Sequence, residues 1–65
     1  MRTAVPIDDL IAERDEWARR MAVAAERWVA ARAAGVDTRE LDEEQARCER
    51  EWRKLDRRIR RRAAR

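Results

Sequence analysis

The chain has 65 residues, 48% of which are charged, and its formal net charge at pH 7 is +3. It contains one cysteine and no histidine, which excludes an intrachain disulfide, a zinc site and a histidine-activated nucleophile. No apolar run approaches the roughly 18 residues that a membrane-spanning helix needs, and the acidic pair Asp8 and Asp9 interrupts any signal-peptide pattern at the N-terminus. We therefore expect a single domain over residues 1–65 in the cytoplasm, without a cofactor, a metal or a membrane partner.

The first predicted helix covers about residues 6–34. Pro6 suits its first turn, where the missing N–H costs nothing, and the acidic pair that follows lies beside the positive end of the helix dipole. Apolar side chains then recur every three or four residues, a spacing that places them on one face of a helix. That face comprises Ile7, Leu10, Trp17, Met21, Ala24 and Trp28, with Arg14 interrupting it.

A turn is predicted at residues 35–37. Gly35, the only glycine, stands where a helix often ends in a left-handed residue. Asp37 and Glu40 have the spacing of a capping box, in which each side chain satisfies a free N–H at the start of the next helix. So short a turn predicts that the helices on either side of it are antiparallel neighbours.

The second predicted helix covers about residues 38–61. Its apolar face has the same spacing and comprises Leu41, Cys48, Trp52, Leu55 and Ile59, with Gln45 interrupting it. Folding the chain about the turn places Trp17 opposite Trp52 and Leu10 opposite Ile59. Three oppositely charged pairs should then flank the seam between the helices. They are Arg27 with Glu44, Arg20 with Glu51, and Glu13 with Arg58.

These patterns predict an all-α fold: an antiparallel two-helix hairpin of the coiled-coil type. A chain of this size supplies only a few kcal/mol from its own core. Because neither a disulfide nor a metal is available to add stability, we expect a second copy to complete a four-helix bundle.

A second apolar stripe on the first helix supports this expectation. It lies beside the seam and comprises Ile11, Ala18, Ala22, Ala25 and Val29. The corresponding flank of the second helix is acidic, with Asp42, Glu49 and Asp56 at heptad spacing. A single neighbouring helix cannot cover both stripes, so the second one predicts contact with itself or with another helical protein. Trp28 is expected at the rim of that contact.

The C-terminal segment, residues 53–65, is strongly basic, with eight basic residues against Asp56 alone. Two interpretations remain open. The cations can complement the helix dipole and lie beside the acidic start of the first helix, which would neutralise them. Alternatively, arginines on the second helix contact nucleic acid. The residues expected to do so are Arg53, Arg57, Arg60 and Arg61.

Two further residues carry expectations of their own. Cys48 lies on the seam, so we expect a buried structural cysteine, with a disulfide between two copies as the alternative. Arg14 interrupts the seam, and we expect its guanidinium to extend toward Asp15 or Asp56.

No catalytic motif or nucleotide-binding loop is present, so neither an enzyme nor a small-molecule substrate is expected. The predicted function is a non-catalytic protein–protein interaction module. A small nucleic-acid-binding regulator is the alternative.

Overall fold

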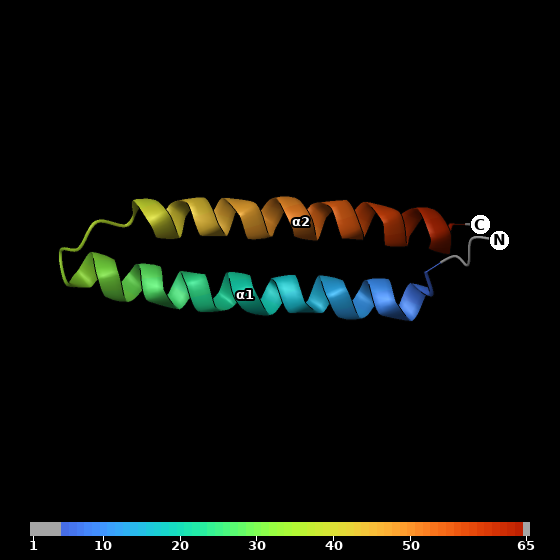
Figure 1. The fold of residues 1–65 in the computed structure, drawn as a ribbon, viewed down its shortest axis with the longest axis horizontal. Helices are drawn as coiled ribbons and strands as arrows, with labels where there is room; N and C mark the ends of the chain where they lie inside the picture. Colours follow the sequence, from blue (N-terminus) through green and yellow to red (C-terminus); the bar gives the residue numbers. More distant parts are fainter. Residues whose placement is uncertain (1–4, 65) are drawn as a thin grey trace.

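A computed structural model describes residues 5–64 of the chain. Two helices, α1 (Ile7–Ala33) and α2 (Arg39–Ala63), lie antiparallel and packed side by side along their length (Figure 1). This confirms the predicted all-α hairpin. Among the described residues, no helix is long and apolar enough to span a membrane.

The helix ends differ from the predicted ends by one or two residues. The first helix starts at Ile7 because Pro6 serves as its N-cap. The second helix continues to Ala63, two residues beyond the predicted end, with arginines filling its last turn. Cations in that turn complement the negative end of the helix dipole and favour the extension. Arg65, the last of the basic residues, lies outside the described part of the chain.

The turn ends α1 in a Schellman motif. Gly35 adopts a left-handed conformation with φ of 72°. The N–H of Val36 donates to the carbonyl of Ala31 at 2.9 Å, and the N–H of Gly35 donates to the carbonyl of Arg32 at 3.1 Å. These are the two bonds of the motif, and they satisfy carbonyls that the helix end would otherwise leave free. The predicted role of the glycine is confirmed.

The predicted capping box at the start of α2 is wrong in its details. The N-cap is Thr38, one residue later than expected, and its side chain makes no capping bond. The Asp37 carboxylate instead accepts the N–H of Arg39 at 3.0 Å, two residues along the chain. This is the bond of an Asx turn, which lets the aspartate satisfy the first free N–H of the helix without the help of Glu40.

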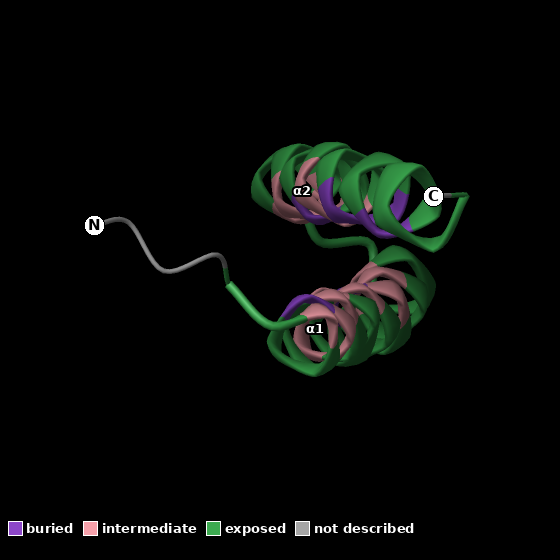
Figure 2. Ribbon diagram, turned by 90° about the vertical axis from the view of Figure 1, so that its right-hand side faces the viewer, coloured by how far each residue is buried: buried purple, intermediate pink, exposed green. Residues whose placement is uncertain are grey.

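The core is the narrow seam between the helices (Figure 2). Its buried apolar residues are Leu10, Ala24, Cys48, Leu55 and Ile59. All of them lie on the predicted apolar faces, so the seam is confirmed. Leu10, Leu55 and Ile59 form one cluster near the chain ends, and Ile7, Ile11 and Trp17 pack against it. Ile11, expected on the second stripe, therefore also belongs to the edge of the core.

The charged pairs predicted to flank the seam do not form in the described structure. Glu51 pairs with Lys54 at 3.3 Å, and Arg20 pairs with Glu16 at 3.5 Å, in each case within one helix. Partners one turn away on the same helix are always within reach, and exposed pairs of either kind differ by only a few tenths of a kcal/mol. Arg20 and Glu51 therefore pair with the nearer partner on their own helix.

One ion pair does cross between the described helices. Nη1 of Arg14 donates to Oδ1 of Asp56 at 2.7 Å, which confirms one of the two directions expected for this arginine. Asp56 is only 8% exposed and accepts a second bond from Nε of Arg60 at 3.0 Å. Its burial was not predicted, since its heptad position was expected at the edge of the seam.

Asp56→Ala should therefore destabilise the hairpin by about 1–3 kcal/mol, because it leaves the half-buried Arg14 without its partner. The matched control is Glu49→Ala, at the same heptad position one repeat earlier. Glu49 is exposed and pairs only within α2, so its loss should cost less than about 0.5 kcal/mol. Urea denaturation followed by circular dichroism measures both free energies of unfolding. Equal losses would contradict the role given to the Arg14–Asp56 pair.

Gly35→Ala should lower the free energy of unfolding by about 1–2 kcal/mol, since an L-residue is strained in the left-handed region. Nothing lies within 4 Å of the position where its Cβ would stand, so a clash cannot contribute. Gly35→Asn should lose less, because asparagine tolerates this conformation better than alanine. If both variants were as stable as the parent in the same urea titration, the turn would not depend on the glycine.

Candidate interaction surfaces

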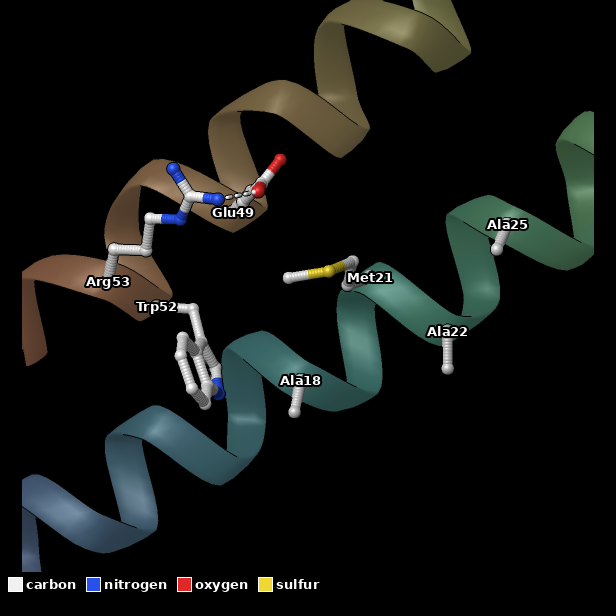
Figure 3. A pocket seen from close by; sticks show the side chains of 7 residues that line it. All are labelled: Ala18, Met21, Ala22, Ala25, Glu49, Trp52 and Arg53. Carbon is white, nitrogen blue, oxygen red and sulfur yellow. Dashed lines mark ion pairs between the residues drawn. The ribbon is translucent and has the colours of Figure 1, made fainter. Parts of the chain in front are cut away.

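An open hollow of about 570 Å³ runs along one side of the hairpin. We call it the alanine groove. It is lined on α1 by Ala18, Met21, Ala22 and Ala25, and on α2 by Glu49, Trp52 and Arg53. Met21 and Trp52 extend into the space between the helices, whereas the alanines leave that wall of α1 low (Figure 3). The groove thus exists because α1 presents small side chains where α2 presents large ones.

The acidic row on α2 shows why the groove opens at this level. Asp42 accepts a hydrogen bond from Nε1 of Trp28 at 2.7 Å, and Asp56 accepts one from Arg14 at 2.7 Å. Glu49 lies midway between these two acids, at heptad spacing. It pairs only with Arg53 of its own helix, at 2.6 Å. Alanines on the facing side of α1 offer no donor to Glu49, so the hairpin is bridged at both ends of the groove and open in the middle.

The predicted partner-binding residues do not all lie in one place. Ala18 and Ala22 are exposed and Ala25 is half-buried, and all three line the groove. Val29 continues the same face of α1 and is 61% exposed. Trp28 is half-buried, and its indole N–H donates to Asp42 on α2. This N–H therefore already bridges the two helices.

Sequence reasoning missed the α2 side of this surface. Trp52 was expected in the seam, opposite Trp17, and Glu49 was noted only as part of an acidic flank. Helical spacing was the available signal, because positions 49, 52 and 53 share the side of α2 next to the alanine face of α1.

Each described tryptophan carries an arginine over its ring. The distances from the guanidinium carbon to the ring centroid are 5.7 Å for Arg14 and Trp52, 4.6 Å for Arg20 and Trp17, and 5.2 Å for Arg32 and Trp28. A cation at this distance is attracted to the ring face. The three rings are half-buried, so they contribute packing area to the hairpin and cation–π contacts to its surface.

A second surface runs along the exposed side of α2, from the edge of the alanine groove at Arg53 to the side that faces away from α1. We call it the basic stripe. It comprises Arg50, Arg53, Lys54, Arg57, Arg60 and Arg61. All six side chains are exposed and recur at helical spacing. Sequence reasoning named four of them as contacts. Lys54 was counted only as part of the basic C-terminal segment, and Arg50, which continues the same spacing toward the turn, was missed.

The basic stripe is only partly neutralised. Arg53, Lys54 and Arg60 pair with carboxylates on their own helix. Arg50 and Arg57 have no carboxylate of the described residues within 4.0 Å, and the same holds for Arg61.

The antiparallel hairpin places the basic end of α2 beside the acidic start of α1, as expected, but no ion pair joins these two regions among the described residues. Glu16 pairs with Arg19 and Arg20 on its own helix. Those contacts hold the pKa of the Glu16 carboxyl below its ordinary value, with the Arg19 hydrogen bond as the largest cause. The two regions meet instead through Arg62, which donates to the backbone carbonyl of Val5.

The single cysteine is buried, as predicted. The Cys48 side chain is 0% exposed, and its S–H donates to Oε1 of Glu44 at 3.6 Å. Burial raises the pKa of the Cys48 thiol, and the negative charge of Glu44 raises it further. No group of three or more metal-ligating side chains occurs within residues 5–64.

Comparison of the chain with protein-family models, with curated proteins and with solved structures gives no match. A function can therefore be inferred only from the two surfaces described above.

The buried thiol yields a test of the folded hairpin. Iodoacetamide should alkylate Cys48 at least about tenfold more slowly in native buffer near neutral pH than in urea, because the reagent attacks an accessible thiolate. The raised pKa further lowers the thiolate fraction in the folded state, so the native rate should increase as the pH rises. Mass spectrometry of timed samples measures both rates. Equal rates with and without urea would show that the thiol is not buried in solution.

Proposed function

We propose that the protein is a non-catalytic helical interaction module that binds a second copy of itself through the alanine face of α1. One observation carries this proposal. The face lies beside the seam, and α2 covers only its edge, so Ala18, Ala22 and Val29 are exposed on a helix whose other apolar stripe is already packed. A helix that is apolar over more than one neighbour's width commonly has a second neighbour.

The positions of these residues match a second copy in an antiparallel arrangement. In a two-fold dimer each surface contacts itself. With the axis between residues 23 and 24, Ala18 lies opposite the partner's Val29, and Ala22 lies opposite the partner's Ala25. The exposed valine thus meets a small residue, and the central layers contain only alanine, which permits the helices to approach closely.

Charge on the flank of this face is also self-complementary. Arg19 and Glu26 each follow an alanine of the face directly in sequence, so both lie on the same flank of α1. Two-fold symmetry brings the same flank of both copies together. Arg19 then faces the partner's Glu26, displaced by only about 3 Å along the helix axis, a gap that these long side chains can bridge.

The proposed dimer would also enlarge the small apolar core of the hairpin. The described hairpin buries few large apolar side chains, and Leu10 and Cys48 are the largest that are fully buried. In the proposed dimer both alanine grooves face the centre of a four-helix bundle, where Met21 and Trp52 gain apolar neighbours. Bundles of this kind are a common solution for short helical chains.

Native mass is the direct test. Size-exclusion chromatography with light scattering, at moderate salt on nuclease-treated protein, should give a dimer for the parent chain. Ala22→Glu and Val29→Glu should each give a monomer, because they bury a carboxylate without a partner. The matched control is Val23→Glu, the same change as Val29→Glu at another exposed valine of α1, about 120° around the helix from Val29, and it should remain a dimer. A monomeric parent chain, or a dimeric Ala22→Glu variant, would overturn the proposal.

A charge exchange tests the register. Arg19→Glu and Glu26→Arg alone should each weaken the dimer by roughly 3- to 30-fold in Kd, since each creates two like-charged contacts per dimer. The double variant Arg19→Glu/Glu26→Arg restores opposite charges and should recover most of the loss. Analytical ultracentrifugation measures the three constants. Additive losses in the double variant would refute this register while leaving dimerisation itself intact.

A further inference from the structure

The basic stripe on α2 is not explained by the hairpin or by the proposed dimer. Over residues 50–61 every exposed side chain of α2 is cationic, whereas the two acids of this segment are half-buried (Glu51) and buried (Asp56). The exposed side of α1 differs, because Glu16 there lies among Arg19 and Arg20 and pairs with both. The single sign of charge is thus particular to α2.

The helix dipole explains only the end of this stripe. Its effect falls off within the last turn of a helix, which here contains Arg60, Arg61 and Arg62. Arg50, Arg53 and Arg57 lie further from the C-terminus, where the dipole gives them little. Like charges three or four residues apart destabilise a helix. Among the described residues of the stripe, only Arg53, Lys54 and Arg60 have carboxylate partners on α2, so the remaining cations work against the fold unless an anion lies along them.

We propose that the basic stripe binds the phosphate backbone of a nucleic-acid duplex. Arginine presents a planar fork of donors that matches phosphate oxygens, and it stays charged at every physiological pH. The stripe extends for about 16 Å along the helix, and duplex DNA carries one negative charge per about 1.7 Å of its axis. A helix of about 10–12 Å diameter also fits a major groove about 12 Å wide.

The composition of the stripe favours nucleic acid over a lipid surface. A helix that lies on a membrane inserts an apolar face next to its cations. The apolar face of α2 is packed against α1 through Cys48, Leu55 and Ile59. No aromatic side chain follows Trp52, so base stacking by this segment is absent as well. Binding through the stripe is therefore electrostatic and independent of base sequence.

Fluorescence anisotropy with a labelled duplex of arbitrary sequence, about 20 base pairs long, tests the proposal across a salt series. The Kd should lie at about 1–100 μM near physiological salt and fall at lower salt, and the plot of log K against log salt should have a slope of about −3.5 to −4.5 on DNA, as for four or five neutralised phosphates. A DNA duplex and an RNA duplex are compared, since both offer the same phosphate chemistry. Preference for one of them identifies the source, and binding to either supports the proposal.

Two variants of equal net charge decide whether the stripe is the site. Arg57→Gln removes a cation from the stripe and should weaken binding several-fold and reduce the salt slope by about 1. Arg27→Gln removes an exposed cation from α1 and should leave Kd nearly unchanged. The triple variant Arg50→Gln/Arg57→Gln/Arg61→Gln should lose most of the binding. Glutamine is a good helix former, so circular dichroism should show intact helices in all three.

Three results would overturn the proposal. The first is no binding to either duplex at low salt. The second is equal weakening by Arg57→Gln and Arg27→Gln, which would make net charge alone responsible. The third is binding to vesicles that contain anionic lipid, without binding to either duplex, which would assign the stripe to a membrane surface. Because the stripe lies on α2 and the dimer contact on α1, a dimer that binds no duplex would refute this proposal alone.

Discussion

Two packed helices can cover only one face of each other, and this constraint governs the whole molecule. The seam buries one stripe of α1 and one stripe of α2, and the remaining surface of both helices is exposed to solvent (Figure 2). What the chain places on that surface differs between the helices. On α1 it is a row of small apolar residues beside the seam, and on α2 it is a row of cations.

The acidic row of α2 connects the seam to the groove beside it. Asp42 and Asp56 find donors on α1, one from the indole of Trp28 and one from the guanidinium of Arg14. Hydrogen bonds that involve a charged group are stronger than neutral ones, so these two contacts add to the apolar packing between the helices. Glu49 meets alanines instead, and no polar bridge closes the middle of the hairpin. Two acids of this row thus bridge the helices, whereas Glu49 makes no bond to α1 and the groove stays open at its level.

Much of this fold follows from the sequence because it rests on strong and periodic signals. The apolar spacing placed Leu10, Cys48 and Ile59 in the seam, and Gly35 located the turn. The flanking ion pairs did not follow, because an exposed glutamate such as Glu51 can pair with any of several cations at nearly equal pairing energies. The burial of Asp56 was missed for another reason: Arg14 was expected to extend toward Asp15 or Asp56, and the heptad spacing alone did not decide which of the two acids would be drawn to the seam.

The two open surfaces also constrain each other through charge. A dimer built on α2 would bring the basic stripes of both copies together, and like charges in contact strongly oppose association. A dimer built on α1 brings together a face whose flank carries both signs, Arg19 and Glu26. It leaves the outer side of each α2 facing solvent, where the cations of both copies add to one field. Electrostatics thus favours the proposed contact through α1 over a contact through α2, and the proposed dimer leaves the cations of α2 accessible to an anion.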